Sequence, residues 1–225
     1  MENSLKCQSL FTLDGILLKE LFDGFNYPWE ILPALKQYIF SLTEKGIDGY
    51  TRLYENVLVG KGVKIADTAR IEGPAVIGDE CEIRHGAYIR GSVILGRGCV
   101  VGNSSEIKNS ILMDGAQIPH FNYVGDSVLG KGAHLGAGAI CSNLRSDKKY
   151  VVIKSEKICV QTGLRKLGAI LGDDVEIGCG AVLCPGTVIG KNTSVYPLTL
   201  ARGIYPENSI VKSGNIVVSK EELLD

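Results

Sequence analysis

The sequence is poor in the side chains from which metal and disulfide sites are built. It has three histidines in 225 residues, and its seven cysteines include no C-x-x-C pair. Scattered cysteines in odd number argue against a disulfide framework and a zinc knuckle, so we expect reduced thiols. The histidines, at positions 85, 120 and 134, form no close pair. This spacing disfavours a zinc-dependent carbonic anhydrase, and we predict that no metal is required.

Net charge and long apolar runs are also missing. The chain has 24 basic and 25 acidic residues, so it lacks the positive excess that nucleic acid or an anionic membrane attracts. No window approaches the roughly 20 apolar residues that span a bilayer. The N-terminus lacks a basic segment followed by a long apolar run. We therefore expect a cytoplasmic protein that binds neither nucleic acid nor membrane.

Glycine is abundant instead, with 28 residues, and it belongs to a six-residue repeat. From residue 59 the chain reads VGKGVK, IADTAR, IEGPAV and IGDECE, and an aliphatic residue begins each unit through Ile107. The phase then shortens twice by one residue, and a second run covers residues 171–200. Three such units of strand and turn would close one triangular coil. No unit buries its apolar residue alone, so the coils must stack into an all-β solenoid with parallel strands.

Two segments interrupt the repeat. Residues 1–50 contain no hexad, and their apolar residues recur at helical spacing, so we predict a small N-terminal helical cap. Residues 145–169 contain two β-rich runs around a turn at residues 155–156, which predicts an inserted loop or hairpin. The solenoid is therefore expected over residues 51–212, followed by a C-terminal tail over 213–225.

One hexad, IPHFNY, departs from the pattern around His120. Pro119 takes a position usually held by Gly, Ala or Asp, and the polar Asn122 takes the small corner position. Arg90 and Lys108 also occupy places where acid or glycine is common, and they are 18 residues apart. Because three hexads make one coil, both cations should lie on one side of the solenoid, within reach of a common anion.

The stretches EIKNS, PHFNYVGD and LGAGAICSN resemble the acetyltransferase domain of the bifunctional enzymes with N-acetylglucosamine-1-phosphate uridyltransferase and glucosamine-1-phosphate N-acetyltransferase activities. NLRSDKK, QTGLRKLGA and CPGTVIG are similar to the archaeal-type sugar-1-phosphate nucleotidyltransferase and acetyltransferase fusions. The resemblance covers residues 57–210. It implies a left-handed parallel β-helix of hexapeptide repeats, a homotrimer with ligand sites between solenoids, and acetyl-CoA as the acetyl donor.

The resemblance also implies roles for individual residues. His120 matches the catalytic base, which takes a proton as the sugar amine attacks the thioester. The residues predicted to bind the amino-sugar phosphate are Arg90, Lys108, Tyr123, His134 and Lys149. The residues predicted to bind acetyl-CoA are Ala137, Asn143, Cys179 and Pro197. A backbone N–H in LGAGA, with Ala137 as the candidate, would stabilise the oxyanion of the tetrahedral intermediate.

Two departures from the family leave the acceptor open. His134 stands where the family has an asparagine, and Leu144 stands where the bacterial enzymes have a tyrosine. The sequence contains no nucleotidyltransferase half, so we expect no pyrophosphorylase activity. The leading hypothesis is an acetyl-CoA-dependent N-acetyltransferase acting on an amino-sugar 1-phosphate such as glucosamine-1-phosphate. The alternatives are a noncatalytic sugar-phosphate-binding or trimerising partner of a separate nucleotidyltransferase, and an acetyltransferase for another small acceptor.

Overall fold

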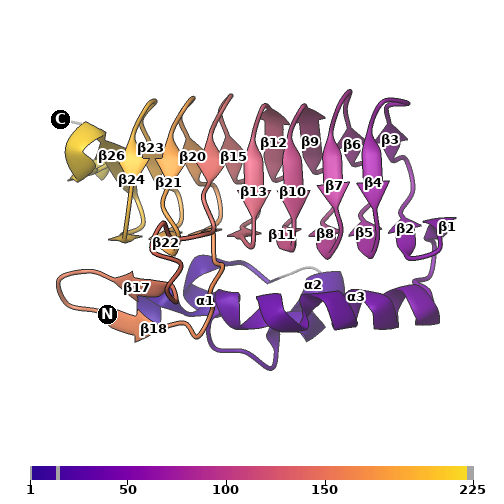
Figure 1. The fold of residues 1–225 in the computed structure, drawn as a ribbon, viewed down its shortest axis with the longest axis horizontal. Coiled ribbons are helices and arrows are strands. Elements are labelled where there is room, and N and C mark those ends of the chain that lie inside the picture. Colours follow the sequence, from indigo (N-terminus) through magenta and orange to yellow (C-terminus); the bar gives the residue numbers. More distant parts are fainter. Residues whose placement is uncertain (1, 14–15, 222–225) are drawn as a thin grey trace.

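The computed structural model describes residues 2–13 and 16–221 and has a parallel β solenoid as its main body (Figure 1). Three sheets run along the length of the solenoid, and within the repeats consecutive strands of the chain belong to different sheets. The predicted left-handed parallel β-helix of hexapeptide repeats is confirmed. None of the helices in the described ranges is long and apolar enough to cross a membrane.

The first sheet, here called the covered sheet, packs against the N-terminal helices. Its strands, in spatial order, are β1 (Thr51–Tyr54), β2 (Val57–Val59), β5 (Ala75–Ile77), β8 (Val93–Leu95), β11 (Ser110–Leu112), β14 (Val128–Leu129), β19 (Ala169–Leu171), β22 (Thr187–Ile189) and β25 (Ile204–Tyr205). β1 pairs antiparallel with β2, and the other neighbours are parallel.

The other two sheets leave their outward faces free of the helices. The seven-stranded sheet contains β24 (Leu200–Ala201), β21 (Val182–Leu183), β16 (Ile140–Cys141), β13 (Tyr123–Gly125), β10 (Glu106–Lys108), β7 (Tyr88–Arg90) and β4 (Arg70–Glu72). The third sheet contains β27 (Ile216–Ser219), β26 (Ser209–Lys212), β23 (Ser194–Val195), β20 (Glu176–Ile177), β15 (His134–Leu135), β12 (Gln117–His120), β9 (Val100–Asn103), β6 (Glu82–Ile83) and β3 (Lys64–Ile65).

Aliphatic side chains stacked from coil to coil fill the interior. Ile89 pairs with Ile107, eighteen residues on, whereas Ile107 pairs with Val124 and Val124 with Cys141 at steps of seventeen. All four side chains are fully buried in one core cluster. The predicted hexad register and its one-residue shortenings therefore correspond to real coils, and the core tolerates the shorter ones because each still contributes one inward apolar residue per side.

The N-terminal segment is helical, as predicted, but it does not cover an end of the solenoid. It contains η1 (Glu2–Leu5), α1 (Cys7–Leu10), α2 (Ile16–Phe22), η2 (Pro28–Ile31) and α3 (Leu32–Lys45), and these helices lie along the covered sheet (Figure 1). Their apolar side chains share one buried cluster with Val76, Ile94 and Ile111, which point outward from that sheet. An apolar outward face needs a second layer to bury it, so the helices lie along the coils.

The inserted segment and the tail also contain strands. β17 (Val152–Lys154) and β18 (Cys159–Gln161) form an antiparallel hairpin beside the solenoid (Figure 1). The hairpin packs closely on the last coils, since a Cβ on Gly186 would lie 2.6 Å from a methyl carbon of Val151. In the tail, η3 (Ser213–Asn215) leads into β27, which pairs antiparallel with β26. Residues 222–225 of the tail lie outside the described residues.

Candidate functional site

The buried side chain of Asn122 builds the turn that presents His120. β12 ends at His120, and the next two residues lead the chain into β13. The Asn122 amide is 2% exposed, and its Oδ1 accepts the His120 N–H at 3.0 Å. Its Nδ2 donates to the carbonyl oxygens of Gly136 (2.8 Å) and Ala139 (3.2 Å). A buried amide satisfied in this way fixes the backbone around it. The polar corner residue singled out in the sequence therefore positions the backbone of His120.

The His120 side chain is exposed at this corner. Its backbone pairs with Asn103 of β9, and this pairing is close because a Cβ on Gly102 would lie 1.6 Å from the Pro119 carbonyl oxygen. Neither imidazole nitrogen has a hydrogen-bond partner among residues 2–13 and 16–221. The ring is therefore attached to a rigid backbone, while both of its nitrogens remain available to a ligand.

His120 belongs to a column of residues that runs along the corner between the third sheet and the seven-stranded sheet. Backbone hydrogen bonds join successive coils here, from Gly138 N–H to His120 O (3.0 Å), from Gly180 N–H to Ala137 O (2.8 Å) and from Leu198 N–H to Cys179 O (2.9 Å). The pairing of Ile177 with Val195 places Pro197 next in this line. The predicted base and three of the residues predicted to bind acetyl-CoA thus occupy equivalent corners of successive coils.

The residues that follow this column have left-handed backbone conformations. Phe121 (φ 54°) and Leu198 (φ 57°) adopt them with large apolar side chains that are 59% and 82% exposed, whereas Gly138 and Gly180 occupy the two corners between them. Strained, exposed apolar residues are unusual and concentrate at functional sites. A Cβ on Gly180 would lie 2.8 Å from a methyl carbon of Leu198, whereas the nearest atoms to a Cβ on Gly138 would be backbone atoms of Gly180 at 3.9 Å.

Arg90 and Lys108 lie on neighbouring strands of the seven-stranded sheet. Ile89 pairs with Ile107, so the cations that follow them stand side by side one coil apart, as the spacing predicted. Each has a carboxylate partner. Arg90 Nη1 is 2.6 Å from Glu106 Oε1, and Lys108 Nζ is 3.2 Å from Asp126 Oδ2. The two carboxylates orient the cations, and the remaining donors of each can serve a bound anion.

Asp126 is a site residue that the sequence reasoning missed. Its side chain is 8% exposed, and its backbone has φ 50°. Besides Lys108, the carboxylate accepts hydrogen bonds from Asn109 Nδ2 at 2.8 Å and from Asn143 Nδ2. It therefore links the lysine predicted to hold phosphate to the asparagine predicted to bind acetyl-CoA. The available signal was its place in VGDSV, a unit one residue short, where a corner has been rebuilt.

Tyr123 completes this group. Its hydroxyl accepts a hydrogen bond from Asn143 Nδ2 at 3.2 Å, and partial burial raises its pKa above the usual value. A Cβ on Gly125 would lie 2.6 Å from both the Tyr123 oxygen and Asn143 Nδ2. The glycine is therefore required for Tyr123, Asn143 and the Lys108–Asp126 pair to meet.

A family comparison agrees with this arrangement of coils. The chain matches the model of the GMPPB C-terminal domain family over residues 71–193, which is more than half of its length. The chain belongs to the GMPPB C-terminal domain family. The matched range contains His120, the Lys108–Asp126 pair and the inserted hairpin.

Relatives of this family member include larger bifunctional proteins. "Bifunctional protein GlmU" of Methanococcus maripaludis is 35% identical over 213 residues, covering 93% of this chain and 52% of the relative. "Bifunctional sugar-1-phosphate nucleotidylyltransferase/acetyltransferase" of Sulfurisphaera tokodaii is 41% identical over 86 residues, 38% of this chain and 21% of the relative. The chain thus spans about half the length of the first relative, and the resemblance noted in the sequence is confirmed.

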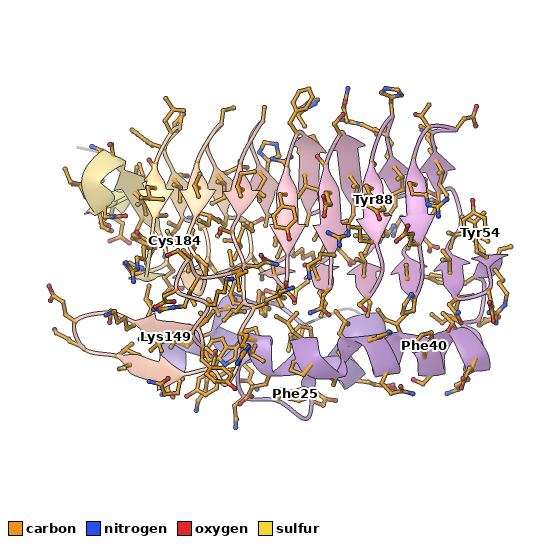
Figure 2. All side chains as sticks on the ribbon, in the orientation of Figure 1. Phe25, Phe40, Tyr54, Tyr88, Lys149 and Cys184 are labelled. Carbon is orange, nitrogen blue, oxygen red and sulfur yellow. The ribbon has the colours of Figure 1, made fainter. Side chains whose placement is uncertain are left out.

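Two predicted ligand residues of this GMPPB C-terminal domain family member lie apart from the Lys108 group. His134 is on β15 of the third sheet, where its Nδ1 is 2.9 Å from Glu176 Oε2. Lys149 lies beside the hairpin (Figure 2), and its backbone N–H donates to Asp147 Oδ1 at 3.2 Å. Within one chain, neither joins Arg90 or Tyr123. Among the residues that the structure describes, no three His, Cys, Asp or Glu side chains group into a metal site.

Proposed function

We propose that this chain is an acetyl-CoA-dependent N-acetyltransferase acting on an amino-sugar 1-phosphate such as glucosamine-1-phosphate. The observation that carries the proposal is the corner column, in which exposed His120 is in line with Ala137, Cys179 and Pro197. The Lys108–Asp126 pair lies on the adjoining seven-stranded sheet, with Lys108 at the end of β10 and Asp126 directly after β13, the strand that follows His120. The name of the Sulfurisphaera tokodaii relative, a sugar-1-phosphate nucleotidylyltransferase and acetyltransferase, supports this choice of reaction and acceptor.

His120 would act as the general base. An amino sugar is mostly protonated at neutral pH, and an imidazole is suited to removing a proton as the nitrogen attacks the thioester carbon. The carbonyl oxygen of the thioester then carries negative charge until the CoA thiolate leaves. The Ala137 N–H has no acceptor among the described residues, so it is free to donate to this oxyanion.

Arg90 and Lys108 would hold the phosphate of the acceptor. Charged donors on neighbouring strands can share one dianion, and the carboxylates of Glu106 and Asp126 keep both donors in place before the ligand binds. Tyr123, whose hydroxyl is held beside Asn143, would contact the same ligand. This pattern favours a phosphorylated sugar over an unphosphorylated one.

We propose that the active form is a homotrimer. One solenoid offers an open corner at His120, and His134 and Lys149 lie on other parts of its surface. In a trimer, residues of a neighbouring solenoid would face the corner and complete the site with these side chains. A monomeric mass by light scattering, in protein that transfers acetyl groups, would contradict this proposal.

A direct test is an acetylation screen of the purified protein. The acceptors are glucosamine-1-phosphate, galactosamine-1-phosphate and the unphosphorylated amino sugars, with acetyl-CoA as donor and release of the CoA thiol as readout. We expect transfer to a phosphorylated acceptor and much slower transfer to the others. Binding of a sugar phosphate without transfer to any acceptor would instead favour the noncatalytic partner of a separate nucleotidyltransferase. A parallel reaction with UTP and the sugar phosphate tests the predicted lack of pyrophosphorylase activity.

A further inference from the structure

A groove of 880 Å³ lies between the hairpin and the last coils of the solenoid. Its floor contains Ser142, Cys184 and Arg202, which follow β16, β21 and β24 at the edge where the chain leaves the seven-stranded sheet. His120 precedes β13 at the opposite edge of that sheet. Figure 2 shows Cys184 where the coils face the hairpin. This hairpin groove contains none of the residues assigned above to acetyl transfer.

The charge of the hairpin groove is positive. Arg145 is neutralised by Asp147, which accepts its Nε at 2.8 Å and its Nη2 at 2.6 Å. Lys154 and Arg202 also line the groove, both are exposed, and neither forms an ion pair with any acid in residues 2–13 and 16–221. Two cations therefore remain uncompensated, which matches the charge of a diphosphate group.

The two free cations stand on segments that touch. A Cβ on Gly203, the residue after Arg202, would lie 3.2 Å from the carbonyl oxygen of Lys154. Both cations line the same groove, so one ligand can contact the two of them. The groove also has apolar lining from Leu144, which is 43% exposed, and from Val152. Pockets of several hundred Å³ that combine apolar walls with a few charged groups are typical of small-molecule sites.

We infer that the hairpin groove binds a nucleoside diphosphate group, with Lys154 and Arg202 holding the phosphates and Leu144 and Val152 contacting the base. The inference goes beyond the proposed acetyl transfer, because none of the residues that line the groove is among those assigned to the base, the acceptor or the acetyl donor. Two ligands carry this chemistry: a uridine diphosphate with or without a sugar, and CoA, whose nucleotide end is an adenosine diphosphate with a further phosphate.

Calorimetric titration of the full chain with UDP, a UDP-sugar, ADP, CoA and uncharged adenosine tests this inference. We expect at least one diphosphate to bind and adenosine to bind far more weakly. Lys154→Ala and Arg202→Ala should each weaken that binding by about tenfold or more, because each removes a charged hydrogen bond. Lys157→Ala is the matched control, since Lys157 is exposed in the turn of the same hairpin and does not line the groove.

The arms of this experiment distinguish the sources of the diphosphate. Loss of UDP binding in the two groove variants assigns the groove to uridine nucleotides, and loss of CoA binding alone assigns it to the coenzyme. Failure of every diphosphate to bind, or an equal loss in Lys157→Ala, would overturn the inference. Melting temperatures of the three variants confirm that each is folded. Binding is measured without acetyl transfer, so the result stands whether or not the proposed activity is found.

Discussion

The covered sheet and the seven-stranded sheet use the same hexads and differ in their outward positions. On the covered sheet these positions carry Val76, Ile94 and Ile111, which are fully buried under the helices. On the seven-stranded sheet they carry polar residues such as Arg90 and Lys108. The inward residues of both sheets fill the core and specify only the coil. The outward residues are therefore free to specify what each face contacts, which is a helical layer on one side and, in the proposed function, a phosphorylated ligand on the other.

The largest expected effect concerns His120, at the corner between the third sheet and the seven-stranded sheet. His120→Ala should lower the acetyl-transfer rate by roughly 100- to 10,000-fold, because it removes the proposed general base. The melting temperature should stay close to that of the native chain, since the ring is exposed and packs against little.

His85→Ala is the matched control for this variant. Ser104 N–H donates to the carbonyl oxygen of His85, which places this exposed histidine in the same corner column, upstream of His120. Its removal should leave the rate unchanged. If His120→Ala instead lost melting temperature and its activity fell only with the amount of folded protein, His120 would be a packing residue.

The second-largest effect is on stability, and it compares an outward residue of the covered sheet with one of the seven-stranded sheet. Ile94→Ala should lower the free energy of unfolding by about 2–5 kcal/mol, because it leaves a cavity between the covered sheet and the helices. Ile140→Ala removes the same atoms from an outward, half-buried position of the seven-stranded sheet, and should cost about 1 kcal/mol or less. Urea denaturation measures both. Equal losses would show that the helices do not stabilise the face they cover.

A smaller effect is expected for substrate binding. Lys108→Ala should weaken binding of a phosphorylated acceptor by about 1.5–3 kcal/mol, the range for a hydrogen bond to a charged group. Binding of the corresponding unphosphorylated sugar should be unchanged. Arg70→Ala provides a control on the same sheet, where Arg70 pairs with Glu72 at a distance of 3.5 Å. Unchanged affinity of the Lys108 variant for the phosphorylated acceptor would remove the phosphate assignment.

The smallest expected effect is none. Treatment with a chelator should leave the acetyl-transfer rate unchanged, because the proposed chemistry uses an imidazole and backbone donors. A loss of activity that added zinc restores would instead assign a metal to the site and make the exposed histidines its candidate ligands.

The sequence predicted the coils because burial requires one aliphatic residue every six positions. It also predicted that Arg90 and Lys108 are neighbours, since register follows directly from the period. The location of the helices was not predicted, because the hexad pattern treats Val76 and Ile94 as variable positions. Their shared apolar character is what distinguishes the covered sheet. Runs of three apolar residues, such as AVI and VIL, carried that information.

The site was predicted less completely than the coils. The corner column emerged from residues that the resemblance supplied one by one, and only the register shows that they are equivalent. Asp126 was missed because a carboxylate in a turn ordinarily lies in solvent, whereas here a shortened coil buries it against Lys108 and Asn143. The place of Lys149 depends on the path of the inserted segment, and in the proposed trimer the roles of His134 and Lys149 depend on a neighbouring subunit, which spacing alone does not determine.

The position of the N-terminal helices has a consequence for how the molecule unfolds. In a bare solenoid each coil touches only its neighbours, so unfolding can begin at an end and proceed coil by coil. Here the helices share one buried cluster with outward residues of six strands, from Val76 to Val188. Asp173 strengthens this link, since its Oδ2 accepts the Thr12 N–H at 2.7 Å while its Oδ1 accepts the Lys131 N–H at 2.9 Å. The helices therefore couple distant coils. Unfolding of a terminal coil would also disrupt the helical layer that packs on the central coils.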